Sequence, residues 1–216
     1  MREPASPSSA PPVAASTQGG SVEHEGRAYA VVADQSLLTL LVFRGGALAK
    51  AGHNHVIASH ALTGTAWVPA DPQRASFEVH VPVNDFTIDE PKLRALEGKE
   101  FSADVPDSAR EGTKKNMLSE PMLDGARFPE VVLRSTRLES GSEGILAMVS
   151  VSIRGQTRDV TVPIRYEVQG NEVRAQGQFA LKQTDLGLTP FSLLGGALRV
   201  EDEMTVKFLV VARAAD

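Results

Sequence analysis

From Arg27 onward, apolar and polar residues alternate along much of the chain. Apolar residues occupy every second position in five segments: 77–83, 145–153, 160–168, 173–181 and 204–210. Because successive side chains of a strand point to opposite faces, this period predicts strands with one buried face. Short polar turns separate the segments, for example at 71–72, 140–144 and 169–171. Strands joined in this way form an antiparallel meander, which loses its exposed edges by closing into a barrel of about eight strands.

One region, residues 89–118, interrupts this alternation. Asp89, Glu90 and Pro91 are typical of a helix start, with Asp89 as the N-cap and the proline in the first turn, where no amide donor is needed. Leu93 and Leu96 then fall on one side of a short helix, and residues 106–118 form a second short helix or loop. We expect this helical insertion to plug one end of an all-β barrel.

The first long strand, residues 36–43, is apolar on both of its faces. A strand that buries only one face has polar residues at alternate positions, so both sides of this strand avoid water. We expect one side to pack under the inserted helices while the other faces the barrel lumen. An apolar lumen would bind a chain-like apolar ligand. The pattern does not separate a lined cavity from an interior filled by side chains, and alone it favours the filled interior.

Residues 1–26 differ in composition from the rest of the chain. Prolines stand there among alanine, serine and glycine, with little that can pack. Such a segment is expected to be a flexible tether. It is either a spacer behind an export signal or lipid anchor, or a tail without function. The sequence therefore predicts a disordered tail, 1–26, and one barrel domain, 27–216.

Composition and charge exclude several function classes. The 216 residues include 22 Lys and Arg against 27 Asp and Glu, a net charge of −5 that argues against nucleic acid. No run of basic residues is long enough to hold an anionic membrane. The absence of cysteine excludes disulfides, thiolate metal sites and a cysteine nucleophile. No apolar run has the length of a transmembrane helix, no signal peptide follows Met1, and no Gly-x-Ser-x-Gly motif suggests catalysis.

The candidate chemistry lies around His53 and His55. In an extended strand these two side chains point to the same side, about 7 Å apart. They would bind a transition metal or haem iron if a third ligand, His60 for instance, converged on them. Otherwise they lie at a barrel rim and bond to backbone, solvent or a ligand head group. Arg154, beside Gly155, either receives an acidic head group or belongs to a tight turn and pairs with an acid such as Asp185.

Several motifs then appear in the order typical of one family. They are Asp34-Gln35-Ser36 before the apolar strand, Leu62-Thr63-Gly64-Thr65, Phe128-Pro129-Glu130-Val131, the stretch from Val151 to Thr157, and Thr184-Asp185-Leu186-Gly187-Leu188. From about Tyr29 to Val211 the chain thereby resembles the YceI-like family of lipocalin-like, polyisoprenoid-binding periplasmic proteins. The resemblance implies a barrel with an elongated hydrophobic channel for an isoprenoid, a quinone or a fatty acid or amide. It also implies a periplasmic or exported protein without catalytic residues.

The sequence thus predicts a non-enzymatic binding, storage or transport protein for an apolar chain molecule. The candidate ligand contacts are Leu38, Leu40, Val42, Phe43, His53, His55, Trp67, Phe179, Phe191 and Arg154. The first alternative is a metal- or haem-binding protein that uses His53, His55 and His60, and a further one is a small isomerase or hydrolase. A bound isoprenoid or other lipid is expected, and a bound metal belongs to the first alternative. Peripheral membrane association through an N-terminal anchor absent from this sequence and a homodimer are further expectations.

Overall fold

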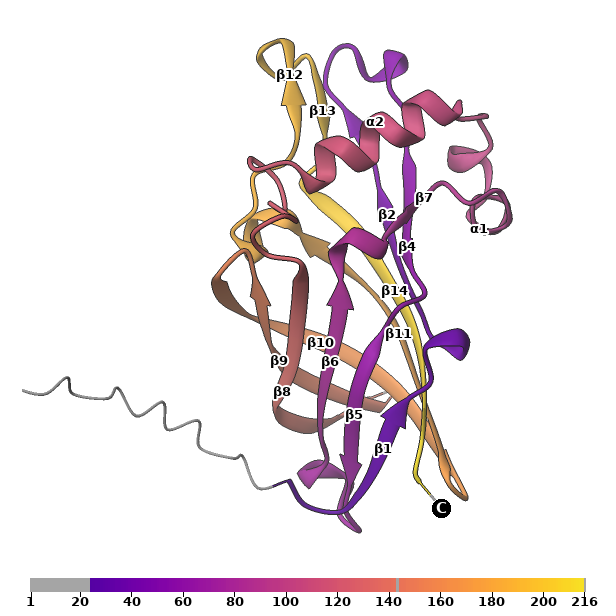
Figure 1. Cartoon of the computed structure of the whole chain (residues 1–216), viewed down its shortest axis with the longest axis vertical. Helices are drawn as coiled ribbons and strands as arrows, with labels where there is room; N and C mark the ends of the chain where they lie inside the picture. Colours follow the sequence, from indigo (N-terminus) through magenta and orange to yellow (C-terminus); the bar gives the residue numbers. More distant parts are fainter. Residues whose placement is uncertain (1–23, 143, 216) are drawn as a thin grey trace, which may run out of the picture.

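The computed structural model describes residues 24–142 and 144–215, which form an elongated antiparallel barrel (Figure 1). The tail predicted for residues 1–26 falls outside this part of the chain except for its last three residues. Within the described residues, eight strands close the barrel through pairing of its last strand with its first. In spatial order they are β1 (Arg27–Val31), β5 (Thr63–Val68), β6 (Ser76–Pro82), β8 (Glu130–Gly141), β9 (Gly144–Ile153), β10 (Gln156–Gln169), β11 (Glu172–Lys182) and β14 (Glu203–Arg213). The predicted fold class is confirmed, and the five alternating segments lie in β6, β9, β10, β11 and β14.

At one end of the barrel the wall is extended by further strands. The long strand β14 pairs with β1 near Ala212 and with β2 (Leu37–Val42) from Thr205 to Leu209. β4 (His55–Ser59) and β7 (Thr87–Ile88) continue the sheet beyond β2. A small separate sheet of β3 (Arg44–Gly45), β13 (Leu198–Val200) and β12 (Ser192–Leu193) rises above this end (Figure 1). The barrel therefore closes tightly at one end and widens at the other.

The insertion between β7 and β8 covers the wide end. It contains α1 (Pro91–Leu96) and α2 (Asp107–Leu118), and α2 crosses the end of the barrel (Figure 1). Within the described residues, no helix combines the length and the apolar character needed to cross a membrane. The insertion also explains the two apolar faces of β2. Leu41 packs with Phe101 and Leu93 of the insertion, whereas Leu38 and Leu40 pack against the main core, as the sequence predicted.

Two details of the predicted first helix are wrong. Leu96 does not share the buried side of Leu93 but is 77% exposed, because α1 is a single short helix that ends at this residue. The N-cap is Glu90, and its side chain makes no capping hydrogen bond. Asp89 is instead fully buried, and its carboxylate accepts a hydrogen bond from Arg94.

Ser36 joins β1, β2 and β14 at the point where β14 changes partner. Its hydroxyl, 3% exposed as a residue, accepts a hydrogen bond from the Val211 amide at 3.0 Å and donates to the Val32 carbonyl at 2.8 Å. Between the residues of β14 that pair with β1 and those that pair with β2, the Ser36 hydroxyl thus takes the place of a backbone partner from a neighbouring strand.

We expect Ser36→Ala to lower the free energy of unfolding by about 1–3 kcal/mol, because it leaves a buried amide without an acceptor. Urea denaturation measures this loss, with Ser108→Ala on the exposed side of α2 as the control. Equal stability of the two variants would show that Ser36 does not support the junction.

Candidate ligand-binding site

The interior of the barrel holds an apolar cavity of about 430 Å³. This volume is within the usual range of small-molecule sites, about 300–1,000 Å³. Inward-facing valine, leucine, isoleucine and phenylalanine side chains from the barrel strands form most of its wall. The period-two pattern thus lines a cavity, and does not fill the interior as the pattern alone had favoured.

The cavity extends along most of the barrel. Its lining residues on β14 run from Met204 to Ala212, a distance of about 26 Å along the strand and about 20 Å along the barrel axis. At the narrow end the lining is formed by residues such as Val31, Val173 and Ala212. The cavity is therefore long relative to its volume, and its deep end is apolar.

The charged and titratable lining residues gather at the wide end. Arg44, His53, His55 and Arg199 line the cavity there, together with Thr113 and Asn116 of α2. His53 makes no hydrogen bond to any other described residue, whereas the four remaining histidines each contact a serine or carboxylate. A ligand with an apolar chain and a polar head would match this division, with its head at the wide end.

Most of the predicted ligand contacts line this cavity. They are Leu38, Leu40, Val42, His53, His55, Phe179 and Phe191. Phe43 does not: it lies on the other side of β2, where its ring meets Phe101 edge-on at 5.7 Å. Phe43 follows Val42 in an extended chain, so the two side chains point in opposite directions.

Trp67 and Arg154 also lie outside the cavity. The Trp67 ring stacks on His24 with 3.5 Å between centroids. Arg154 occupies a tight turn at φ +50° beside Gly155 at φ +68°. Its guanidinium donates to the backbone carbonyls of Glu120 and Pro121. The turn interpretation is correct, and the pairing with Asp185 is wrong.

The predicted metal triad is not assembled. His53 and His55 point to the same side, with ring centroids 6.2 Å apart, as their spacing predicted. His60 lies beyond the far end of β4, where it contacts Glu90 at 2.9 Å. In the part of the chain that the structure describes, no three His, Cys, Asp or Glu side chains are placed to hold a metal ion.

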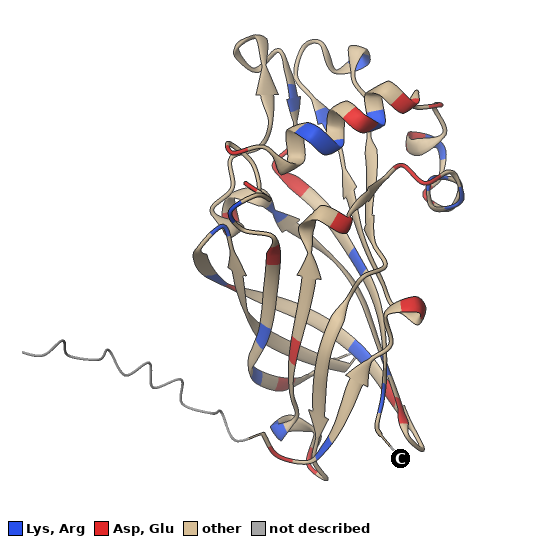
Figure 2. Cartoon of the chain, in the orientation of Figure 1, with Lys and Arg blue, Asp and Glu red and all other residues tan. Residues whose placement is uncertain are grey.

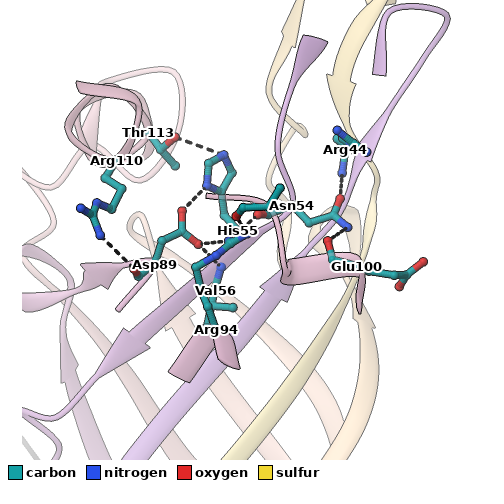
Figure 3. A network of polar contacts seen from close by, with 10 residues as sticks. Arg44, Asn54, His55, Val56, Asp89, Arg94, Glu100, Arg110 and Thr113 are labelled. Carbon is teal, nitrogen blue, oxygen red and sulfur yellow. Dashed lines mark hydrogen bonds and ion pairs between the residues drawn. The ribbon is translucent and has the colours of Figure 1, made fainter. Parts of the chain in front are cut away.

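At the wide end of the barrel, a buried polar network centred on Asp89 holds β4 and the helical insertion together (Figure 3). The Asp89 carboxylate accepts hydrogen bonds from His55 at 2.6 Å, from Arg94 at 2.5 Å and from the Val56 amide at 2.8 Å. Arg94 also donates to the carbonyls of Asn54 and Ala103. The network ties β4 to α1 and to the following loop.

The same network orients His55 toward the cavity. Nδ1 of His55 contacts Asp89, and Nε2 lies 3.3 Å from the hydroxyl of Thr113 on α2 (Figure 3). Asp89 itself is held at φ +55°, a conformation that aspartate tolerates better than most residues. The sequence did not predict that Asp89 binds His55 and Arg94. The run Asp89-Glu90-Pro91 is equally typical of a helix start, and nothing in the pattern distinguishes Arg94 from other arginines.

Burial alone would raise the pKa of Asp89. The hydrogen bonds from His55, the Val56 amide and Arg94 outweigh burial and hold the pKa of this carboxyl below its ordinary value. Asp89 is therefore an anion in the folded protein at neutral pH. It balances the charge of Arg94, whose side chain is 8% exposed.

This closed antiparallel barrel, with an apolar cavity and one polar end, defines a lipocalin-like protein. The YceI-like domain model matches residues 29–212, so the chain belongs to the YceI-like family.

Similar solved structures agree with this fold. BcnA from Burkholderia cenocepacia aligns with a TM-score of 0.61 at 15% identity, over 84% of this chain and 99% of BcnA. The YceI protein of Campylobacter jejuni aligns with a TM-score of 0.50 at 9% identity, over 72% of this chain and 82% of its own. At these identities the likeness concerns the fold alone. No curated protein matches the sequence.

Asp89→Asn keeps the shape of the side chain and tolerates the positive φ, but it removes the charge that balances Arg94. We expect the free energy of unfolding at neutral pH to fall by about 3–5 kcal/mol, the usual cost of an unpaired buried charge. The control is Asp107→Asn, which breaks a largely exposed pair with Arg110 and should change stability by less than about 1 kcal/mol. Similar losses in both variants would contradict a central role for Asp89.

The pH dependence of this difference tests the lowered pKa of Asp89. The stabilisation is complete above the unfolded pKa of about 3.9 and is lost as the pH falls through the lower folded value. We expect the stability difference between wild type and Asp89→Asn to be full above about pH 5 and to shrink below about pH 4. Denaturation curves at several pH values measure it. A difference that grew on acidification would reverse the sign and refute the argument.

Proposed function

We propose that this protein binds a single elongated apolar molecule in its barrel and acts as a carrier or reservoir. The observation that supports it most directly is the apolar cavity of about 430 Å³ inside a closed barrel. Burial of an alkyl or prenyl chain there is favourable by about 25 cal/mol for each Å² removed from water. Membership of the YceI-like family agrees with hydrophobic ligand binding.

The shape of the cavity supports a chain molecule as the ligand. A modest volume spread over the length of the barrel suits one chain better than a broad ring system. We propose an isoprenoid, a quinone tail or a fatty acid or amide, with its polar head among Arg44, His53 and Arg199. The chain would then lie in the apolar part between this group and the narrow end.

We propose binding without turnover. General acid–base or nucleophilic catalysis requires titratable groups at the reacting bond. The charged and titratable lining residues lie at the wide end, where Asp89 and Thr113 hold His55. A buried chain would touch alkyl and aromatic side chains. Export to the periplasm remains part of the proposal, on the strength of the family.

Filling the cavity tests the proposal. Val162 and Thr161 are neighbours of similar shape on β10, and only Val162 lines the cavity. We expect Val162→Trp to weaken binding of cis-parinaric acid, a fluorescent fatty acid, by at least about tenfold, because the indole occupies the ligand's place. Thr161→Trp, on the exposed face, is the matched control and should bind as wild type does.

Wild-type protein that binds neither cis-parinaric acid nor a fluorescent prenyl chain would refute the proposed function. So would equal binding by the two tryptophan variants, since the ligand would then lie outside the barrel. Thermal unfolding of both variants checks that they remain folded.

A further inference from the structure

Two loops project beyond α2 at the wide end of the barrel (Figure 1). We call residues 44–54 and 191–200 the mouth loops. They lie side by side, because β3 pairs with β13 and the Leu48 amide donates to the Ala197 carbonyl at 2.7 Å. Both loops also line the cavity, through residues such as His53, Phe191 and Leu198. They therefore form the part of the cavity wall that projects beyond α2.

The mouth loops expose leucine side chains. Leu48 is 46%, Leu193 47% and Leu194 74% exposed. Single exposed apolar residues are ordinary, but three on two adjoining loop tips form a patch. Each contributes an exposed apolar side chain on a loop that also lines the cavity.

Two features of Leu194 are unfavourable: its side chain is exposed to water, and its backbone has a positive φ. It is held at φ +51°, between Leu193 and two glycines that also have positive φ. A bulky side chain at positive φ is uncommon, whereas asparagine or glycine is at ease there. Local folding preferences do not explain a leucine at this position, whereas contact of its side chain with another surface would.

The charge of the mouth loops is opposite to that of the whole chain. Their sequences contain Arg44, Lys50 and Arg199 and not one Asp or Glu, in a protein whose net charge is −5. Arg199 contacts Glu201, just beyond its loop, at 3.4 Å. Within the described residues Arg44 and Lys50 contact no carboxylate. Figure 2 shows basic residues on both mouth loops, whereas α2, set back from them, carries both signs. No basic run is visible in the sequence, because the fold brings distant cations together.

From these observations we propose that the mouth loops dock on a phospholipid surface that contains anionic lipid. The exposed leucines enter the interface while Lys50, which does not line the cavity, meets a phosphate group, and the charges of Arg44 and Arg199 add to the attraction. The wide end of the barrel then faces the bilayer, and a chain molecule enters or leaves the cavity between the mouth loops and the membrane without crossing water. The docking surface is independent of any anchor at the N-terminus. The passage of a ligand rests on the proposed function.

Flotation with vesicles of equal parts phosphatidylcholine and phosphatidylglycerol tests the docking, and pure phosphatidylcholine vesicles are the comparison. We expect wild type to bind the mixed vesicles, and Leu193→Ser with Leu194→Asn to bind at least about tenfold less. This variant should unfold at the same temperature or higher, because asparagine suits the backbone of residue 194. The matched control is Leu146→Ser with Met148→Ser, which removes exposed apolar side chains, 41% and 36% exposed, from the outer wall of β9.

The charges give a second, separate readout. Lys50→Glu should weaken binding to the mixed vesicles by about fivefold or more, and high salt should weaken binding of the wild type. Equal binding by the leucine variant and the β9 control would overturn the proposal. So would wild-type protein that binds neither kind of vesicle.

Binding of cis-parinaric acid in vesicle-free buffer separates the two proposals. A leucine variant that retains this binding but loses vesicle binding supports docking as a distinct property of the mouth loops. Wild type that binds the probe but no vesicles refutes docking and leaves the carrier function standing. Wild type that binds mixed vesicles but no probe supports docking and refutes the carrier function.

Discussion

One edge of β14 pairs with β11 along its whole length, and the other edge pairs with β1 near one end and with β2 near the other. This division of the second edge is the constraint on which the architecture depends. Where β14 meets β1 the sheet closes, and the interior narrows onto small and branched apolar residues. Where β14 meets β2 the wall continues into β4 and β7 and leaves room for the helical insertion. Where this edge of β14 passes from β1 to β2, the Ser36 hydroxyl accepts the hydrogen bond of the Val211 amide, which would otherwise be buried without a partner. One closed end and one covered end follow from this single junction.

Asp89 attaches the helical insertion to the sheet at the covered end of the barrel. An anion that accepts bonds from β4 and from Arg94 joins the sheet, α1 and the loop after it through groups that are nearly inaccessible to water. The adjacent histidines differ in consequence. His55 is committed to Asp89 and Thr113, while His53 keeps its ring nitrogens free of other described residues and lines the cavity. His55 is thus held in place by the protein, whereas the ring of His53 remains available to a ligand.

The barrel was predictable from sequence because period-two patterning and turn chemistry act locally. The division of the strand at 36–43 into a lumen face and a face under the insertion was also predicted correctly, apart from Phe43. The cavity was not predictable, since Val160 or Val206 would look the same in a filled core. Phe43 was misplaced by a single step of the strand. Trp67 was misplaced because its segment has no clear alternation that assigns its faces, and its ring stacks on His24 instead of lining the cavity. The ion pair of Asp89 with Arg94 and the adjacency of the mouth loops depend on tertiary contacts that no local pattern records.

Trp67 is the one tryptophan of the chain, and it lies on β5 with its ring against His24, just before the first strand. Its ultraviolet emission therefore originates at the base of the barrel, on the outside, and an imidazole in face-to-face contact is a natural quencher of that emission. The intrinsic optical signal of this protein reports how the segment leading into β1 is attached to the wall. Tryptophan emission is therefore insensitive to ligand or membrane contacts at the wide end of the barrel.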